Sequence, residues 1–326
     1  MFFALYLIYW YNINTAFQKF LNINLTIERG ESIDNIAQKM KTNGLINSEV
    51  IFKLYLYLNN KTNKIKAGKY QFSDYYSIIK LAEILIAGEN KSNTVRVKII
   101  EGWSSRDINT YLLKNNLPAR ENFLTLTQNK ISNWQFYFIK PTFMADAPER
   151  ANLEGYLFPD TYEIYNNSSA EDLIKKMLYN MDLKLDDNLR AEIAKQKKTI
   201  FEILTMASLI EKEVKKPDMN LVSGIFWKRI KNGQRLESCA TLAYIIGVNK
   251  VQYSFEDTLI DSPFNTYRNN GLPPGPISNP GLDAIRAAVY PTETQFMFFL
   301  ARPDTGETVF SSTLDEHNKN KLKYLK

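Results

Sequence analysis

The chain has 326 residues, 44% of them apolar, and 41 basic against 35 acidic side chains give it a net charge of +6. This length exceeds the roughly 100–200 residues of a typical domain and predicts two domains, and the apolar content excludes a wholly disordered chain. The single cysteine, Cys239, excludes an internal disulfide, and the single histidine, His317, excludes a multi-histidine metal site.

These two residues could form a nucleophile and base pair, but no third, orienting group stands out, and a lone cysteine usually packs as a small apolar group. We therefore expect carboxylates, hydroxyls and amides to carry any chemistry, with no metal and no cofactor. The mild positive charge suits a solvated surface, an anionic lipid or an acidic polymer equally well. No recognised nucleic-acid-binding motif accompanies it, so no nucleic-acid partner is expected.

The first 18 residues form an uncharged, apolar N-terminus. Its densest part, residues 2–11, is shorter than the roughly 20 residues of a spanning helix, and neither a basic start nor a cleavage site accompanies it. We interpret residues 1–20 as a partial membrane anchor. An ordinary buried helix is the alternative.

Residues 21–91 predict a small α+β module. A strand at residues 25–27 precedes a helix opened by Ser32 and stopped by Gly44. A second helix begins near Ser48, and its expected apolar stripe is Val50, Ile51, Leu54, Tyr55 and Leu58. Residues 66–72 and a helix over residues 77–88 complete the module.

Residues 92–326 predict a larger mixed α+β domain, which follows a polar run at residues 88–93 and opens with an alternating strand at residues 94–100. Helices are expected at residues 104–115, 170–180, 200–215, 219–231 and 236–246. A Pro- and Gly-rich loop covers residues 262–280, and Asn279 with Pro280 is expected to cap the helix that follows. A hairpin over residues 296–310 and a helix capped by Thr313 and Glu316 end the chain.

The strongest candidate for chemistry is the segment LEGYLFPDTY at residues 153–162. Glu154 lies among aromatic and aliphatic neighbours, which raise the pKa of a carboxyl by removing its hydration. Such a group can hold a proton near neutral pH, as a general acid must. A turn whose glutamate points to water is the alternative.

A second acid, glycine, aromatic sequence occurs at Glu101, Gly102 and Trp103. It lies between a strand and a helix that Ser104 and Asp107 can cap, so a structural junction explains it adequately.

Glu211 lies on the apolar side of the helix predicted over residues 200–215, whereas Glu202 and Glu213 point to the opposite side. A carboxylate in an apolar stripe must be paired, protonated or open to a cleft. An ion pair with Arg229 or Arg268 and a place in the cleft of Glu154 are the two interpretations. In the second, Asn265 and Tyr267 of the proline-rich loop line the same cleft.

Five ordered blocks carry a family resemblance: LEGYLFPDTYE (153–163), ASLIEKEV (207–214), SPFNTYR (262–268), GLPPGPISNPG (271–281) and VFSSTLDEHN (309–318). In order and spacing they resemble the YceG-like endolytic murein transglycosylases. The segment from residue 25 to about residue 88 is more loosely similar to that family's LysM-like module.

The resemblance implies a single-pass protein of the inner (cytoplasmic) membrane whose catalytic part faces the periplasm or cell wall. It implies glycan strands of peptidoglycan as substrate and peptidoglycan synthases as possible partners. Glu154 takes the place of the family's catalytic glutamate, which cleaves between N-acetylmuramic acid and N-acetylglucosamine and leaves 1,6-anhydro ends. Further candidate substrate-binding residues are Tyr156, Asp160, Glu211, Asn265, Tyr267 and Arg268.

One departure lies at residues 236–241, where Glu237, Cys239 and Ala240 replace an amide, an acid and a proline of the family pattern. Two other functions stay open. One is a two-carboxylate glycosidase that pairs Glu154 with Asp160 or Glu211 and uses water. The other is a non-catalytic scaffold that binds peptidoglycan.

Overall fold

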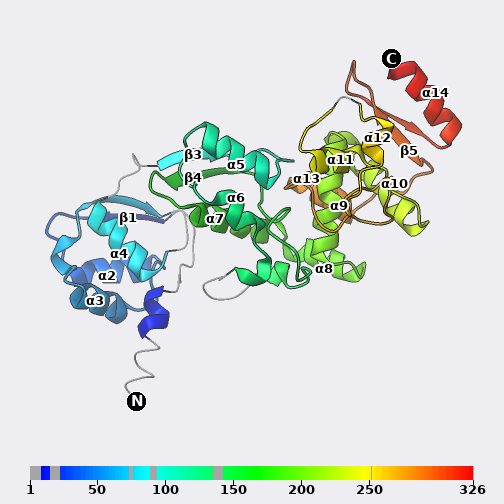
Figure 1. Ribbon diagram of the computed structural model, residues 1–326. Helices are drawn as coiled ribbons and strands as arrows, with labels where there is room; N and C mark the ends of the chain where they lie inside the picture. The colour runs from blue at the N-terminus through cyan, green and yellow to red at the C-terminus, as the bar shows by residue number, and fades with distance from the viewer. Residues whose placement is uncertain are drawn as a thin grey trace. The chain divides into compact units, whose positions relative to one another are not determined.

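A computed structural model describes residues 9–14, 23–72, 76–88, 94–134, 142–250 and 252–325. The chain divides into two compact units (Figure 1). The first contains Met1–Val95, and the second contains Arg96–Trp134 and Lys140–Lys326. Helices and small antiparallel sheets occur in both, which confirms the predicted α+β class.

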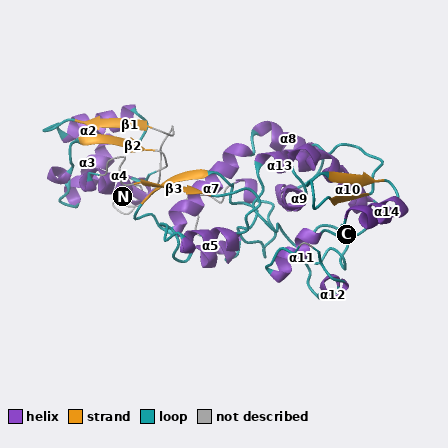
Figure 2. Ribbon diagram, turned by 90° about the horizontal axis from the view of Figure 1, so that it is seen from above, coloured by secondary structure: helices purple, strands orange, loops and turns teal. Residues whose placement is uncertain are grey.

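The first unit pairs two antiparallel strands, β1 (Ile23–Ile27) and β2 (Gly68–Phe72), with Leu25 opposite Tyr70. Alternate residues of β1 are buried, as expected for a strand with one covered face. The helices are α2 (Ile33–Thr42), α3 (Glu49–Leu58) and α4 (Ile78–Ala87), with the short 3₁₀ helix η1 (Thr62–Lys64) before β2. Figure 1 shows these helices on one side of the strand pair, and Figure 2 shows the same unit from above.

Serine caps begin all three helices, because Ser32, Ser48 and Ser77 each accept a hydrogen bond from a backbone N–H of the first turn. The predicted stripe of α3 was correct for Tyr55 and wrong for three of its five residues. Val50, Leu54 and Leu58 are exposed, and the buried residues are Phe52, Tyr55 and Leu56. Apolar side chains occur all round this helix, so periodicity does not identify the face that the core selects.

The predicted anchor, residues 1–20, lies mostly outside the described residues. Its described part, residues 9–14, is helical. Within the described ranges, no helix has both the length and the apolar character needed to cross a bilayer. The anchor therefore stays a prediction.

The strand β3 (Thr94–Lys98) spans the boundary at Arg96, leads into the second unit and pairs with β4 (Thr161–Tyr165). Between and after these strands lie α5 (Ser105–Lys114), α6 (Phe123–Gln128), η3 (Ile131–Asn133), η4 (Thr142–Met144) and α7 (Ala170–Lys184). Neither β4 nor α6 was expected from the sequence.

The rest of this unit surrounds α9 (Ile200–Glu213), in which every residue from Ile203 to Ile210 is buried. The α9 helix packs against α13 (Leu282–Val289), α10 (Met219–Lys231), α11 (Cys239–Ile246) and α8 (Asp187–Lys195). The remaining elements are η5 (Lys216–Asp218), α12 (Phe255–Thr258), α14 (Leu314–Tyr324) and the antiparallel pair β5 (Phe298–Ala301) and β6 (Thr308–Ser311).

Two predicted helix starts are corrected. The α11 helix begins at Cys239, after an extended stretch that was expected to be helical from residue 236. The α13 helix begins at Leu282 with Gly281 as its N-cap, so Asn279 does not cap it. The predicted capping pairs of Ser104 with Asp107 and of Thr313 with Glu316 are confirmed.

Candidate active site

Glu154 lies in a tight turn and is only 5% exposed. The next residue, Gly155, has φ +84°, a left-handed conformation that favours glycine. A Cβ at this position would collide with the ring of Pro276. The glycine therefore lets the proline-rich loop pack directly on the turn that presents the acid.

Three hydrogen bonds hold the Glu154 carboxyl. The backbone N–H of Ser105 donates to Oε1 at 3.0 Å and to Oε2 at 3.1 Å, and Nδ2 of Asn279 donates to Oε1 at 2.9 Å. Ser105 is the first residue of α5, so the carboxyl faces the positive end of this helix. Among the described residues, no lysine or arginine forms an ion pair with it.

Burial raises the pKa of Glu154 to about 7, the hydrogen bonds from Ser105 and Asn279 oppose this rise, and the charge of Asp107 adds to it. A group with this pKa is divided between acid and carboxylate near neutral pH, which is the range in which it can both donate and accept a proton. The hydroxyl of Ser105 is also buried and, among the described residues, has no hydrogen-bond partner.

Asn279 is fully buried and connects three segments of the site. Its Oδ1 accepts from the N–H groups of Gly155 at 2.9 Å and Leu157 at 3.0 Å. Its Nδ2 donates to the carbonyl of Trp103 at 3.0 Å as well as to Glu154. Sequence reasoning missed this role because it gave Asn279 to the following helix. The only signal was an asparagine inside a rigid loop.

The segment Glu101, Gly102 and Trp103 belongs to the same arrangement. The N–H of Gly102 donates to the carbonyl of Asn279, and the N–H of Asn279 donates to the carbonyl of Trp103, each at 2.9 Å. The junction interpretation was therefore correct for the cap of α5 and incomplete for this contact. The segment also fixes the loop that carries Asn279.

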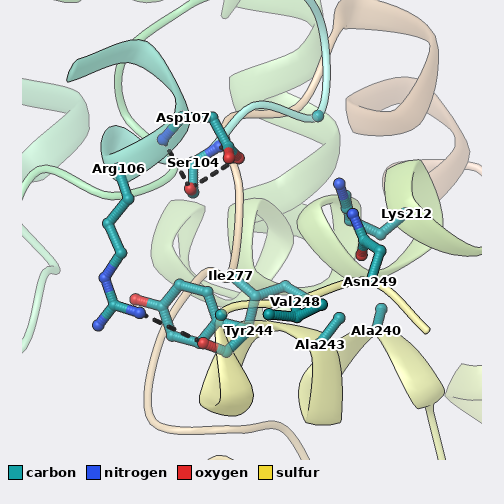
Figure 3. A pocket seen from close by; sticks show the side chains of 12 residues that line it. Ser104, Arg106, Asp107, Lys212, Ala240, Ala243, Tyr244, Val248, Asn249 and Ile277 are labelled. Carbon is teal, nitrogen blue, oxygen red and sulfur yellow. Dashed lines mark hydrogen bonds between the residues drawn. The ribbon is translucent and has the colours of Figure 1, made fainter. Parts of the chain in front are cut away.

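An open pocket lies next to this site (Figure 3). Ser104 and Arg106 of the α5 start, Lys212 of α9, Tyr244 of α11, and Asn249 contribute to its wall. Burial, and secondly the nearby charge of Glu154, raise the pKa of Tyr244 to about 12. Tyr244 therefore lies in the pocket wall and within range of the charge of Glu154.

Glu211 is neither paired with an arginine nor part of the pocket wall. Its Oε2 accepts from the N–H of Gly281 at 3.0 Å, and burial raises its pKa, with Glu101 and Asp283 adding to the rise. The ion-pair interpretation is wrong, because Arg229 pairs with Glu237 and Arg268 lies near Asp261. Glu211 instead holds the chain two residues beyond Asn279.

Glu213, which was predicted to point away from the apolar side, is a second carboxyl that is shielded from solvent. It accepts from the Ser238 hydroxyl and from the N–H of Ala240 at 3.2 Å, both at the start of α11. Burial raises its pKa. Glu202, by contrast, completes the capping box of α9 with Thr199.

Tyr156 and Asp160 follow Glu154 closely in the sequence, but their side chains make structural contacts. The Tyr156 side chain is fully buried, its ring lies 6.0 Å from that of Phe143, and burial raises its pKa. Asp160 is exposed and accepts from the N–H of Thr161 at 2.7 Å and from Asn180 at 3.0 Å. Neither contacts the Glu154 carboxyl.

The predicted loop residues stabilise the loop itself. Asn265 is fully buried, donates to the carbonyls of Thr258 and Ile260, and accepts from the N–H of Tyr267. The hydroxyl of Tyr267 lies 3.1 Å from Sγ of Cys239, and Arg268 donates to the carbonyl of Leu259.

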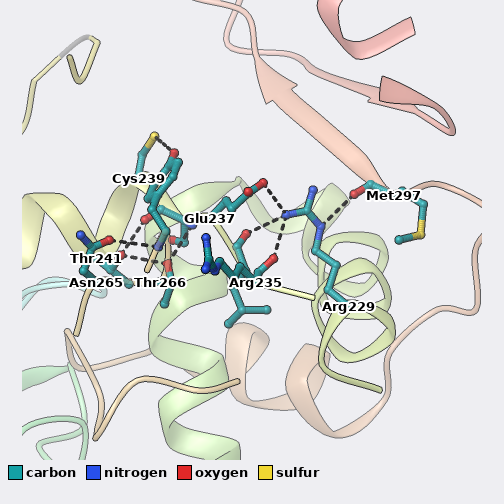
Figure 4. Close-up of polar contacts among 11 residues, drawn as sticks. Arg229, Arg235, Glu237, Cys239, Thr241, Asn265, Thr266 and Met297 are labelled. Carbon is teal, nitrogen blue, oxygen red and sulfur yellow. Dashed lines mark hydrogen bonds and ion pairs between the residues drawn. The ribbon is translucent and has the colours of Figure 1, made fainter. Parts of the chain in front are cut away.

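Figure 4 shows Glu237 and Cys239, two of the three departures noted at residues 236–241, among the polar contacts around the start of α11. Arg229 donates to the carbonyls of Arg235, Leu236 and Met297 and lies 3.3 Å from Glu237. The hydroxyl of Thr266 accepts a hydrogen bond from the N–H of Ser238, the residue before α11. Glu237 thus takes part, through Arg229, in fixing the segment that precedes α11. His317, the other half of the possible pair with Cys239, stacks on Phe298.

The model of the YceG-like family matches residues 25–323. The chain belongs to the YceG-like family. It is 32% identical over 309 residues to the endolytic murein transglycosylase of Bacillus subtilis (strain 168), with 93% of this chain and 85% of that protein covered.

The endolytic murein transglycosylase of Streptococcus pneumoniae (serotype 2, strain D39) is 31% identical over 319 residues, and the chain spans 57% of its length. A crystal structure of a yceG-like protein from Listeria monocytogenes has a TM-score of 0.62 and 32% identity, with 92% of this chain and 99% of that chain covered. The family resemblance drawn from the five sequence blocks is therefore confirmed.

Proposed function

We propose that this YceG-like chain is an endolytic lytic transglycosylase of peptidoglycan, with Glu154 as general acid and then base. The curated relatives are named endolytic murein transglycosylases, and they match more than nine-tenths of this chain. The observation that carries the assignment of Glu154 is a buried carboxyl with a pKa of about 7, which accepts a hydrogen bond from Ser105, the residue after Ser104 in the wall of an open pocket.

The reaction needs only one such acid. Protonated Glu154 donates to the glycosidic oxygen between N-acetylmuramic acid and N-acetylglucosamine, and the bond from that oxygen to the anomeric carbon breaks. The resulting carboxylate takes the proton of the muramic C6 hydroxyl, whose oxygen closes on the anomeric carbon. No water is consumed, and the product ends in a 1,6-anhydro ring.

The two carboxyl oxygens are not equivalent. Oε1 accepts from both Ser105 and Asn279, whereas Oε2 accepts only from Ser105. We assign the transferred proton to Oε2, because this oxygen accepts fewer hydrogen bonds from the protein. The donors on Oε1 stabilise the carboxylate that forms once the proton has left, and the start of α5 adds its positive end.

The two-carboxylate alternative has little support from the contacts. Asp160 is engaged by Thr161 and Asn180, and Glu211 by Gly281. Among the described residues, Asp107 is the carboxylate whose charge raises the pKa of Glu154, and its own oxygen takes part in the cap of α5. A nucleophilic carboxylate would have to be free to reach the anomeric carbon.

The finer points of the family resemblance are proposed with this function. They are a LysM-like role for the first unit, an N-terminal membrane anchor, a catalytic unit on the cell-wall side and a contact with peptidoglycan synthases. The first unit supports its part with the order strand, helix, helix, strand, with the two strands paired.

The test is the chemical nature of the new ends. Purified glycan strands are digested with the wild-type chain and with Glu154→Gln, and the ends are identified by mass spectrometry. We expect 1,6-anhydro-muramic ends, one water lighter than reducing ends, and none from the variant. Reducing muramic acid as the main new end would establish hydrolysis instead.

A further inference from the structure

The pocket beside Glu154 carries basic side chains that the reaction above does not use. Arg106 comes from α5 and Lys212 from α9, and both are exposed. Among the described residues, neither forms an ion pair with a carboxylate. Figure 3 shows them on different walls of the pocket, with Asn249 near Lys212.

Arg106 is held in position without being neutralised. Its Nη1 donates to the Tyr244 carbonyl at 3.4 Å, and its guanidinium lies 5.6 Å from the centre of the Tyr244 ring. Tyr244 is itself packed against Phe264, with ring centres 5.2 Å apart. These contacts use one N–H and one face of the guanidinium, so further donors remain for a ligand.

Among the described residues, Asp107 is the carboxylate in the pocket wall, and one of its oxygens is hydrogen-bonded by Ser104. Its Oδ2 accepts from the N–H of Ser104 at 2.9 Å and from the Ser104 hydroxyl at 2.8 Å. Lys212 also lies near Glu211, whose own carboxylate accepts from Gly281. The start of α5 adds its positive end to the same wall. With two basic side chains and one carboxylate in its wall, the pocket favours an anion.

Two features connect this pocket to the reacting bond. Ser104 in the wall directly precedes Ser105, which donates to the Glu154 carboxyl, and the charge of Glu154 helps to raise the pKa of Tyr244, which also lies in the wall. A sugar bound at Glu154 thus places its substituents at the pocket. On peptidoglycan, the anionic substituent is the lactyl group of muramic acid, or the peptide stem attached to it.

We propose that Arg106 and Lys212 bind a carboxylate borne by the muramic acid residue at the cut bond. This inference rests on the proposed function, because it assumes a glycan at Glu154. Guanidinium and ammonium groups are the side chains suited to a carboxylate, and arginine can bind it in a bidentate manner. The pocket would select strands by the charge of this substituent.

The test uses the full chain with Glu154→Gln, so that the ligand is not cleaved, and measures binding of three tetrasaccharides by titration calorimetry. One carries peptide stems, one is stem-free with lactyl carboxylates, and one has these carboxylates converted to neutral amides. We expect at least one anionic form to bind about tenfold more tightly than the neutral form. The anionic form that is preferred identifies the source of the carboxylate.

Arg106→Gln combined with Lys212→Gln should remove this preference. Lys114→Gln, an exposed position at the far end of α5, should keep it. Equal binding of all three ligands, or a preference that survives the double substitution, would overturn the proposal. A failure of the proposed function would show separately, as an absence of anhydro ends when the unmodified chain digests the same ligands.

Discussion

Glu154 and Glu213 are two carboxyls of the same unit that face the start of a helix, and burial raises the pKa of both. Glu154 accepts from the first N–H of α5, and Glu213 accepts from an N–H in the first turn of α11. Neither forms an ion pair among the described residues. By desolvation alone, either could be an acid catalyst.

Their remaining contacts separate them. Glu213 is bound by Ser238 and Ala240, which are close in sequence and belong to one helix start. Glu154 is bound by α5 and by the distant Asn279, and it influences a tyrosine of an open pocket. A raised pKa therefore marks a buried acid, and the pocket and the converging loops mark the reactive one.

The sharpest way to break this comparison is to neutralise each acid in turn. Glu154→Gln should lower the rate of strand cleavage by about 10³-fold or more, because it removes the transferred proton. Glu213→Gln should stay within about tenfold of wild type, because no reacting proton passes through it. The rate of muropeptide release measures both, and equal losses would remove the distinction.

The next largest effect is expected at Asn279. Asn279→Ala leaves the N–H groups of Gly155 and Leu157 without their acceptor, at a cost of roughly 1–3 kcal/mol for each unpaired group. A small displacement of Glu154 can by itself cost about 10²-fold in turnover. We therefore expect losses in both melting temperature and turnover number.

Asn265→Ala is the matched control, because Asn265 is equally buried and also joins loop segments. It should lower the melting temperature comparably and turnover by less than about tenfold, since Asn265 does not contact Glu154. Comparable turnover losses in the two variants would show that the effect of Asn279 is only structural.

The pH dependence sharpens the comparison further. The proposed acid must be protonated in the free enzyme, so kcat/KM should fall tenfold per pH unit above about 7. Because the hydrogen bond from Asn279 lowers the pKa of Glu154, residual activity in Asn279→Ala should fall at higher pH than in wild type. A fall centred near the ordinary pKa of a glutamate would contradict burial as the cause.

Stability should follow the same titration. Since the folded pKa of Glu154 is above its unfolded value, its contribution is fully present below about 4.5 and is lost as the pH rises through about 7. The wild-type chain should therefore lose melting temperature relative to Glu154→Gln between pH 5 and pH 8.

Local rules predicted much of this fold. The serine and threonine caps and the glycine stops depend on neighbours three or four residues away, and the structure has them at Ser32, Ser48, Ser104 and Thr313. The burial of Glu154 could be predicted for the same reason, because its apolar neighbours are adjacent in sequence.

Long-range contacts decided what could not be predicted. The strand β4 pairs with β3, which lies more than sixty residues earlier. Asn279 contacts Glu154 from a separation of 125 residues, so its local sequence suggested only a helix cap. Glu213 is the last residue of α9, where the approach of α11, and not helical periodicity, determines its surroundings.

The smallest effect is expected at Glu211, where substitution tests whether the carboxyl has a structural or a catalytic role. Its carboxyl accepts from Gly281, so it fixes the loop beyond Asn279, but Glu101 and Asp283 oppose its charge. In Glu211→Gln, the amide oxygen can keep the hydrogen bond while the repulsion disappears. Because the folded pKa of Glu211 is raised, its charge lowers the free energy of unfolding most at high pH. The melting temperature of the variant should therefore exceed that of wild type by more at pH 8 than at pH 5, with a difference of a few degrees at most.

Turnover of Glu211→Gln should stay within about threefold of wild type, since the segment that holds Asn279 keeps its anchor. Glu202→Gln, at the other end of α9 and outside the site, controls for removal of a negative charge from this helix. A large loss of turnover with an unchanged melting temperature, seen for Glu211 and not for Glu202, would mean that Glu211 acts on the substrate. The single-acid mechanism would then have to give way to one with two carboxylates.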